Sequence, residues 1–210
     1  MLGLPRGGVV VAYEVARVLH APLDVVIVRK VGAPSQPELA MGALAEGNVT
    51  IRLTDVCVGL RIADDEYSRV ASRELLELDR RVRRYRKHHG AVDLVGRTAI
   101  VVDDGIATGA TARAAAASVR ARGADRVVVA APIAGALAAK ELARVFDDIV
   151  VLVIARGPFS VGSYYERFEQ TSDREVSGYL TRSRRTPPNS PNADASDDQR
   201  GRSAHIRRSP

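Results

Sequence analysis

The chain has 210 residues, 46% of them hydrophobic, and a net charge of +6, which fits one globular domain with a hydrophobic core and a short additional segment. It contains no run of about 18 apolar residues, and Arg6 interrupts the apolar N-terminus, so we expect neither a membrane-spanning helix nor a signal peptide. The one cysteine, Cys57, excludes an internal disulfide and fits a reducing compartment, so we expect a cytoplasmic protein.

Short β-rich runs alternate with helical patterns, which predicts parallel βαβ units and an α/β fold. In chain order we expect strand 2–4, helix 10–19, strand 23–28, a two-proline loop at 33–37, strand 41–45, helix 64–87, strand 98–102, helix 112–122, strand 126–131, helix 136–146, strand 149–154, an aromatic segment at 159–168 and helix 173–180. The expected domain covers residues 1–182.

Residues 183–210 are expected to form a disordered tail. They consist mainly of Ser, Pro, Asn, Asp and Arg, and hold six arginines against three aspartates. Such a segment has too little apolar surface to offset the entropy lost on ordering. It is interpreted as an uninvolved extension, with a nucleic-acid tether as the alternative.

A basic run closes the long helix. Val82 and Tyr85 continue the apolar stripe of the helix through it, so a docked helix with a solvated basic face is the simpler interpretation. Contact with nucleic acid is the alternative. The run consists of Arg80, Arg81, Arg83, Arg84, Arg86 and Lys87.

Two adjacent carboxylates, Asp103 and Asp104, end the clearest buried strand. Ligands of parallel sheets bind beyond the carboxyl ends of the strands. Carboxylate oxygens at this place can accept hydrogen bonds from two vicinal ribose hydroxyls or hold a hydrated Mg²⁺. The alternative is a solvated acid pair followed by an ordinary turn.

The turn that follows the acid pair predicts an anion site. Backbone N–H groups would converge there at a helix N-terminus, which favours a phosphate. Glycine lets the backbone approach closely, and two threonines add hydroxyl donors. The residues expected to bind the phosphate are Ala107, Thr108, Gly109, Ala110 and Thr111.

Four apolar residues, two acids and a Thr-Gly-x-Thr loop together closely resemble the signature of type I phosphoribosyltransferases. The resemblance implies a doubly wound, mainly parallel sheet with a helical insertion at about 62–89, and a homodimer. It implies 5-phosphoribosyl-1-pyrophosphate as substrate, Mg²⁺ as cofactor, and Asp103 and Asp104 as catalytic and metal-binding residues.

The segment 3–8, Gly-Leu-Pro-Arg-Gly-Gly, resembles the pyrophosphate-binding loop of the same family, which implies a role for Arg6, Gly7 and Gly8. The chain begins almost at this loop, whereas relatives normally have a helix and a fuller strand before it. Either the start is misassigned or the domain is truncated at its N-terminus, which would leave the sheet edge incomplete.

The segment 28–34 resembles the Arg-Lys-x-Gly element of adenine phosphoribosyltransferases. That resemblance implies that Arg29 and Lys30 supply positive charge to the diphosphate and that 33–40 is a mobile lid. A solvated strand end is the alternative for the two basic residues. Glu38 and Glu46 are candidates for a general base by their place near the lid.

The order of motifs, including the stretch 161–176, looks like a bacterial group of predicted phosphoribosyltransferases of unassigned substrate. In purine enzymes of the family a side chain after the last core strand stacks on the base, which implies this role for Phe159, Val161 and Tyr164; alternatively these residues cover the sheet edge. Ala107 stands where enzymes for 6-oxopurines carry an Asp, which argues against such a substrate.

The sequence thus predicts a transferase of nucleotide metabolism that passes a phosphoribosyl group to a nitrogenous acceptor. One alternative is a regulator of the same fold that binds the sugar diphosphate and nucleic acid without turnover. The other is a nonfunctional fragment of a larger protein.

Overall fold

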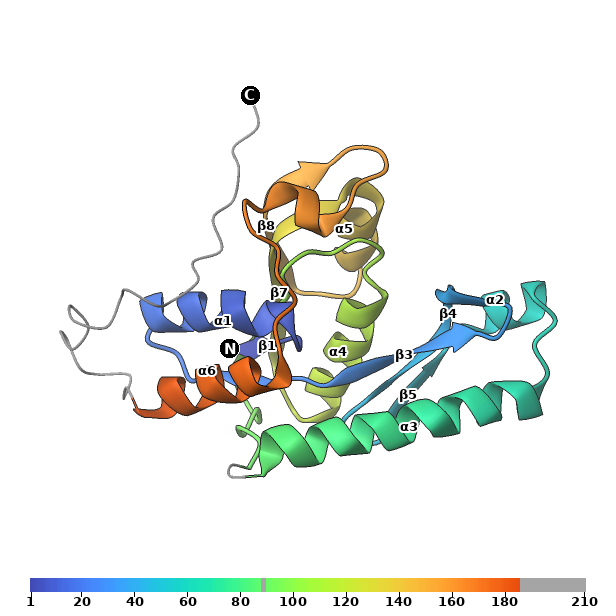
Figure 1. Cartoon of the computed structure of the whole chain (residues 1–210), viewed down its shortest axis with the longest axis horizontal. Coiled ribbons are helices and arrows are strands. Elements are labelled where there is room, and N and C mark those ends of the chain that lie inside the picture. The colour runs from blue at the N-terminus through green and yellow to red at the C-terminus, as the bar shows by residue number, and fades with distance from the viewer. Residues whose placement is uncertain (88–89, 186–210) are drawn as a thin grey trace.

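A parallel β-sheet forms the body of the molecule (Figure 1). The computed structural model describes residues 1–87 and 90–185, apart from the side chains of Glu38 and Arg185, and within these residues the sheet has five strands in the order β2-β1-β6-β7-β8. All neighbours in it are parallel, which confirms the predicted α/β fold. The strands are β1 (Leu2–Gly3), β2 (Asp24–Val25), β6 (Thr98–Val102), β7 (Arg126–Gly135) and β8 (Asp148–Ala155).

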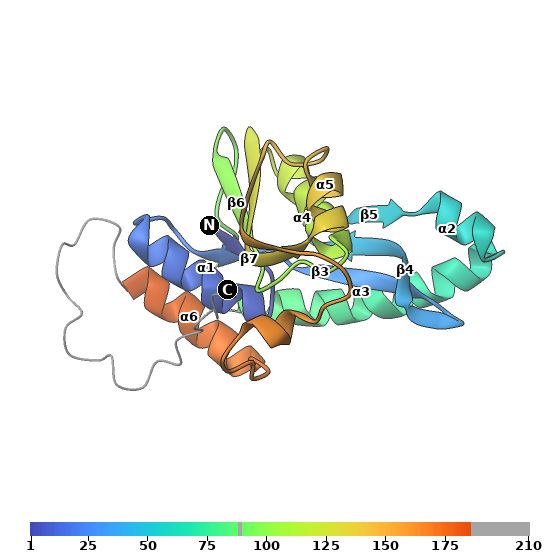
Figure 2. The same ribbon diagram turned by 90° about the horizontal axis from the view of Figure 1, so that it is seen from above.

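Helices cover both faces of this sheet (Figures 1 and 2). They are α1 (Gly7–Val18), α4 (Ala110–Ala121), α5 (Ala136–Leu142) and α6 (Asp173–Arg185). Along β6 the buried side chains alternate: Val101 packs in one cluster with α4 and α5, and Val102 packs in another with α1 and α6. This is the period of two that a strand buried on both faces requires, and it confirms the doubly wound arrangement.

A second, antiparallel sheet and a long helix form an arm that projects from the body (Figures 1 and 2). The strands follow the order β3-β4-β5. Val31 and Met41 of this sheet share a buried cluster with Tyr67 and Leu78 of the long helix. The elements of the arm are β3 (Val28–Ala33), β4 (Gln36–Ala45), β5 (Val49–Arg52), α2 (Thr54–Gly59) and α3 (Asp64–Arg86).

The prediction of a loop at 33–37 is wrong, because β3 and β4 are joined by a tight turn at Pro34 and Ser35. The pairing register between the two strands shifts at Gly32, and Pro37 lies in this irregular part of β4. An irregularity of this kind tolerates a residue that lacks an N–H group, so a proline can stand inside a strand.

The strand predicted for 23–28 is wrong as one element, because β2 ends at Val25 and Val28 begins β3 of the other sheet. Most other predicted elements differ from the structure at their ends. The helix 64–87 and the strand 98–102 are confirmed to within one residue. The helix predicted for 136–146 ends at Leu142, and β5 and α2 were not predicted. The last helix continues to Arg185, beyond the expected boundary at 182, and the rest of the predicted tail, 186–210, lies outside the described residues.

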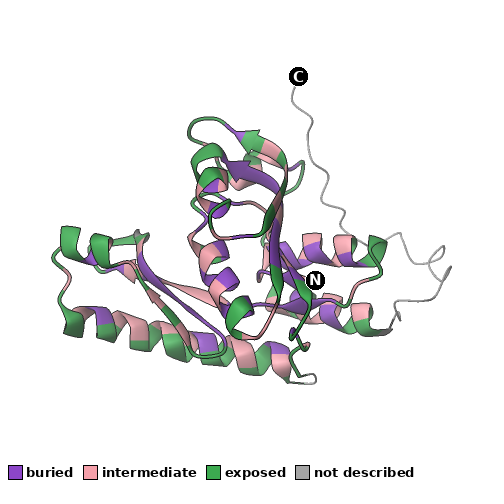
Figure 3. Cartoon of the chain, turned by 180° about the vertical axis from the view of Figure 1, so that it is seen from behind, coloured by how far each residue is buried: buried purple, intermediate pink, exposed green. Residues whose placement is uncertain are grey.

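Burial is concentrated along the parallel strands and the helix faces turned toward them (Figure 3). Cys57 is buried in the arm, where its thiol lies 3.7 Å from the carbonyl oxygen of Met41, as expected for a small core residue. No helix in the described part of the chain combines the length and apolar character needed to cross a membrane.

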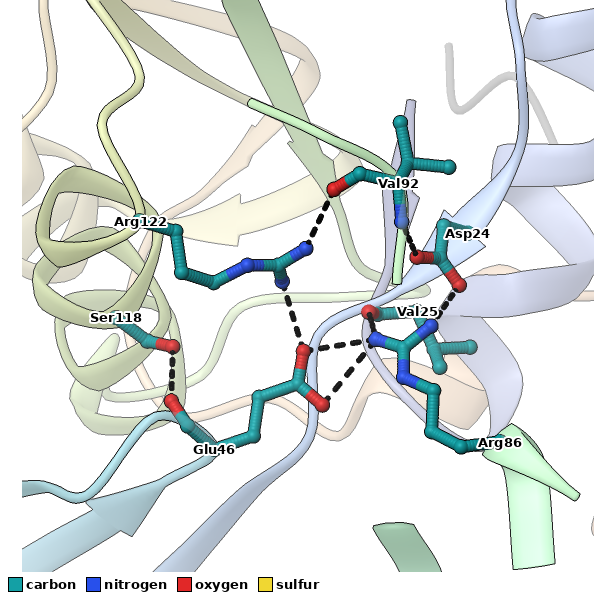
Figure 4. A network of polar contacts seen from close by, with 7 residues as sticks. All are labelled: Asp24, Val25, Glu46, Arg86, Val92, Ser118 and Arg122. Atoms are coloured by element: carbon teal, nitrogen blue, oxygen red, sulfur yellow. Dashed lines mark hydrogen bonds and ion pairs between the residues drawn. The ribbon is translucent and has the colours of Figure 1, made fainter. Parts of the chain in front are cut away.

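A buried network of four charged residues joins the arm to the body (Figure 4). Arg86 at the end of α3 donates to Asp24 of β2 and, at 2.8 Å, to Glu46 after β4. Arg122 after α4 donates to the same Glu46 carboxylate at 2.7 Å. Burial raises the pKa of Glu46, and the two guanidinium groups oppose that effect. Two negative and two positive groups therefore balance one another away from water.

We expect Arg86→Met to destabilise the protein by about 3–5 kcal/mol, because Asp24 and Glu46 would lose a shared cation while remaining buried. Chemical denaturation measures this loss. The matched control is Arg80→Met on the same helix, whose pair with Glu77 is exposed and whose loss should be far smaller. Equal effects of the two substitutions would contradict the structural role of the network.

Candidate active site

The acid pair lies where the sequence predicts it, directly after β6 at the carboxyl edge of the parallel sheet. Asp103 and Asp104 are both half-buried, and the N–H group of Asp104 donates to Oδ1 of Asp103 at 3.0 Å. Burial raises the pKa of Asp103, and the neighbouring carboxylate of Asp104 raises it further. The pKa of Asp104 is also raised by burial. Carboxylates held in this way at a ligand-binding edge are typical of functional sites.

The predicted pyrophosphate loop packs directly on the acid pair. The N–H group of Leu4 donates to the carbonyl oxygen of Val102 at 2.8 Å, which fixes the loop beside β6. A Cβ atom at Gly8 would lie 2.6 Å from the carbonyl oxygen of Val102 and 2.9 Å from Cα of Asp103. A Cβ atom at Gly7 would overlap the carboxylate of Asp104. The backbone contact requires glycine at position 8, and a side chain at position 7 would displace the Asp104 carboxylate, so the N-terminus of α1 meets the acids.

The predicted phosphate turn forms on the other side of the acid pair. Ile106 is bound to β7 through its N–H group, which donates to the carbonyl oxygen of Ile133 at 2.9 Å. Gly109 adopts φ +74° as the N-cap of α4, where no side chain caps the helix. Thr108 and Thr111 are exposed on either side of it. The first N–H groups of α4 therefore have no side-chain cap and lie between two exposed threonines, which is compatible with an anion site.

The aromatic segment lies over the same edge. Val161, in the short helix η1 (Val161–Tyr164), packs against Gly105 beside the acid pair. The rings of Phe159 and Tyr164 meet edge to face with centroids 6.0 Å apart. All three predicted base-contacting residues, Phe159, Val161 and Tyr164, are half-buried, so each retains accessible surface near the acids.

Sequence reasoning missed Tyr165, which holds this segment in place. Its hydroxyl donates to the main-chain oxygen of Asp104 at 2.6 Å, and its ring packs on Phe168 with centroids 5.2 Å apart. Burial raises the pKa of the Tyr165 hydroxyl, with the charges of the two aspartates adding to the effect. Two adjacent tyrosines were visible in the sequence, but only the fold shows which one turns inward.

The structure separates the two basic residues of β3. Successive side chains of a strand point to opposite faces, so Arg29 and Lys30 do not project toward the same place. Arg29 forms an ion pair with Glu74 of α3, with Nε 2.8 Å from Oε2. Lys30 lies on the same face as Val28, which packs against the cluster that contains α4.

Arg6 lies near the C-terminal end of α3, where Tyr85 is located. Burial and a hydrogen bond to Asp173 raise the pKa of Tyr85, and the positive charges of Arg81 and Arg6 oppose that rise. At about 1.5 Å per residue, Glu74 and the Arg29 that it binds lie about 16 Å along α3 from Tyr85. The structure therefore does not bring Arg29 to the loop that contains Arg6.

The segment proposed as a lid, 33–40, forms the hairpin of the arm, between β3 and β4 (Figure 1). Glu46 is bound by Arg86 and Arg122, and its carbonyl oxygen accepts from Ser118 at 2.7 Å near the C-terminal end of α4. It is therefore unsuited to act as a general base at the opposite end of that helix. The side chain of Glu38 lies outside what the structure describes.

The acid pair suits Mg²⁺ by the chemistry of its donors. Mg²⁺ is commonly held by one or two carboxylates together with substrate phosphates and water. Asp103 and Asp104 offer two carboxylates beside an anion site. Among the described residues there is no group of three or more His, Cys, Asp or Glu side chains that could hold a metal ion alone. Substrate oxygens would therefore have to complete the coordination.

Comparison with known proteins agrees with this geometry. Residues 1–166 match the family described as phosphoribosyl transferase domain. The chain belongs to this phosphoribosyl transferase domain family. It is 48% identical over 185 residues to curated proteins from two strains of Mycobacterium tuberculosis, CDC 1551 and H37Rv, each named "putative phosphoribosyl transferase".

The similarity covers most of this chain and less than half of each curated relative. The aligned region covers 88% of this chain and 42% of the curated relatives, so the similarity establishes a common domain and not a common whole protein. The crystal structure of TT1426 from Thermus thermophilus superposes with a TM-score of 0.74 at 44% identity, covering 86% of each chain. This chain therefore shares its fold with that protein over most of its length, and the family match covers residues 1–166 of it.

On the expectation that this edge binds 5-phosphoribosyl-1-pyrophosphate with Mg²⁺, Gly8→Ala should weaken that binding by at least about tenfold, or about 1.4 kcal/mol. The added methyl group would meet the backbone of Val102 and Asp103, which cannot move away without shifting β6. Isothermal titration calorimetry measures the affinity. Gly178→Ala in α6 is the control, because its Cβ atom would meet no atom within 4 Å.

We expect Asp103→Asn to raise the thermal midpoint of the metal-free protein at pH 7–8 by on the order of a few degrees. The folded-state pKa of Asp103 is raised, so its charged form is less stable in the folded than in the unfolded chain. The wild type should gain stability as the pH falls through this raised pKa, and the difference between the proteins should then disappear. Scanning calorimetry with a chelator present tests this; a lower midpoint for the variant at pH 8 would contradict it.

Proposed function

We propose that the protein binds 5-phosphoribosyl-1-pyrophosphate with Mg²⁺ and transfers its phosphoribosyl group to a nitrogenous acceptor. One observation carries the proposal. The acid pair Asp103–Asp104 lies between a glycine loop that contains Arg6 and the open N-terminus of α4, all at one edge of the sheet. Such an arrangement offers separate places for a diphosphate, a sugar diol and a phosphate monoester.

Each part of the substrate has a matching group. The 5-phosphate would accept hydrogen bonds from the amides of the first turn of α4 and from the hydroxyls of Thr108 and Thr111. The ribose hydroxyls would donate to Asp103 and Asp104. The diphosphate would lie against the amides of the loop at Gly7 and Gly8, beside Arg6.

In the reaction, the bond between ribose C1 and the pyrophosphate oxygen breaks as an acceptor nitrogen bonds to C1 and releases its proton to solvent. The ribose passes through an oxocarbenium-like state, and the pyrophosphate leaves with the electron pair of the broken bond. When bound, Mg²⁺ supplies positive charge to the leaving pyrophosphate. Arg6 adds to that charge, and each well-placed group of this kind contributes on the order of 3 kcal/mol.

The acceptor would bind beside the aromatic segment. Phe159 and Tyr164 offer half-buried rings, and Val161 holds the segment on Gly105. Position 107 is an exposed alanine, so no carboxylate is available there to contact a base nitrogen. We therefore infer an acceptor other than a 6-oxopurine, within nucleotide metabolism. The single cysteine fits a reducing compartment, and we propose a cytoplasmic location.

The alternative, a regulator that binds nucleic acid, gains little from the basic run on α3. Arg80 and Arg81 both pair with Glu77, Arg84 pairs with Asp173, and Arg86 belongs to the buried network. Charges neutralised within the protein contribute little to phosphate binding. The observed pairing favours the interpretation of α3 as a docked helix with a solvated face.

We expect the double variant Asp103→Asn, Asp104→Asn to lose at least about a hundredfold in affinity for the sugar diphosphate with Mg²⁺, or about 2.7 kcal/mol. Both metal-binding and diol-binding oxygens would be altered. Calorimetry measures this affinity, and Arg83→Glu on the exposed face of α3 is the control.

Release of pyrophosphate in the presence of a panel of nitrogenous bases separates the enzyme from the regulator. Turnover with any acceptor supports the transferase. Tight binding without turnover, together with retention of RNA or DNA at about 0.15 M salt, would establish the regulator instead. Unchanged affinity in the double variant would refute the assignment of the site altogether.

A further inference from the structure

Two glycines at the edge of the parallel sheet make room for side chains of the aromatic segment 159–168. A Cβ atom at Gly105, just beyond β6, would lie 2.6 Å from Cγ2 and 3.0 Å from Cβ of Val161. A Cβ atom at Gly135, where β7 ends, would lie 3.1 Å from Cε1 of Phe159. Neither glycine has a positive φ, so it is the space they leave that matters here. The segment is thus seated on the ends of two neighbouring strands.

A hydrogen bond adds a polar contact to these two. The hydroxyl of the buried Tyr165 donates to the main-chain oxygen of Asp104 at 2.6 Å. That oxygen belongs to the peptide unit that joins Asp104 to Gly105, so the bond holds the same turn on which Val161 rests. Burial raises the pKa of the Tyr165 hydroxyl, which therefore keeps its proton and remains a donor at neutral pH.

Tyr165 is itself held firmly within the segment. Its ring lies 5.2 Å from that of Phe168, centroid to centroid, and its N–H group donates to the carbonyl oxygen of Gly162 at 3.2 Å. The ring of Phe168 also closes the space beside Gly162, where a Cβ atom would come within 2.8 Å of Cδ1. Because the segment is packed in this way, a displacement at Tyr165 is passed on to its neighbours.

The two parts that Tyr165 joins have different tasks in the proposed reaction. Asp104 belongs to the acid pair that would hold the ribose and Mg²⁺, and the segment offers Phe159 and Tyr164 to the acceptor. The reacting atoms must be held about 3–3.5 Å apart, with their orbitals aligned, before the bond forms. The contacts at the two glycines are apolar and have little directional preference, whereas a hydrogen bond fixes both distance and direction.

We propose that Tyr165 is a positioning residue of the transferase: through the main chain of Asp104 it holds the acceptor-binding segment in register with the acid pair, so that occupation of the acid pair orders the segment. The tasks given to the two parts rest on the proposed function, whereas the coupling between them is a property of the fold. Tyr165 acts through its neighbours and need not contact either substrate.

The first test needs no ligand. Hydrogen exchange followed by mass spectrometry should show that Tyr165→Phe speeds exchange both in 159–168 and in 103–106 by at least about threefold, because the two segments lose a shared bond. Tyr13→Phe is the matched control: Tyr13 is half-buried in α1 and stacks on Tyr179, and its replacement should change neither segment. Faster exchange in 159–168 alone would show a purely local structural role and would overturn the proposal.

The second test adds 5-phosphoribosyl-1-pyrophosphate and Mg²⁺. In the wild type they should slow exchange in 159–168 by at least about threefold, and Tyr165→Phe should abolish this slowing. Because coupling is reciprocal, a link of this size predicts that the affinity, measured by calorimetry, changes by no more than about threefold in the variant. Slowing that persists in Tyr165→Phe would contradict the proposed link.

A kinetic measurement connects the link to the reaction. With a nitrogenous base that the wild type turns over, Tyr165→Phe should lower kcat/KM for the base by at least about tenfold, because the base is held less exactly against ribose C1. Tyr13→Phe is again the control. An unchanged kcat/KM for the base would rule out a positioning role.

The outcomes for Tyr165 and for the proposed function can be told apart. A wild type that fails to bind the sugar diphosphate refutes the function, and exchange without ligand then still decides whether Tyr165 couples the two segments. A wild type that binds the sugar diphosphate and turns over a base, with both segments unaffected by Tyr165→Phe, overturns the coupling and leaves the function standing.

Discussion

The backbone at Gly7 and Gly8 lies directly against Asp103 and Asp104, and no space remains for a side chain between the glycines and the acids. The acids follow β6, and the glycines that touch them begin α1, so residues about a hundred positions apart depend on one close contact. Packing interiors to this density leaves little tolerance for added atoms. The turn before α4, the glycine loop before α1 and the aromatic segment are all placed relative to this contact.

Partial burial of the two charged aspartates lowers the stability of the folded state. Burial raises the pKa of Asp103, and repulsion from the carboxylate of Asp104 raises it further. The structure supplies compensation around them: the N-terminus of α1 faces the acids, and Tyr165 fixes the main chain of Asp104. Strain of this kind is typical of sites that bind a cation or a polar substrate, because the ligand removes the repulsion.

Much of the fold and the centre of the site could be predicted from the sequence because they depend on local patterns. The segment 98–111 contains a strand, an acid pair and a helix start in an uninterrupted order, and each has a short-range signal. The ion pairs could not be predicted from local sequence patterns. That Arg29 faces Glu74, or that Glu46 meets Arg86 and Arg122, depends on how distant elements pack. The hairpin at Pro34 was hidden because two prolines suggest a loop, whereas a shift of register accommodates one of them inside β4.

The arm has a further consequence for the evolution of the domain. Its tight turn at Pro34 and Ser35 is exposed and joins two antiparallel strands. Exposed tips of this kind accept insertions with little effect on the framework that carries them. The buried ion pairs at the base of the arm fix the position at which it joins the body. Selection can therefore lengthen or decorate the tip, acquiring new attachments there, while the chemistry at the sheet edge is conserved.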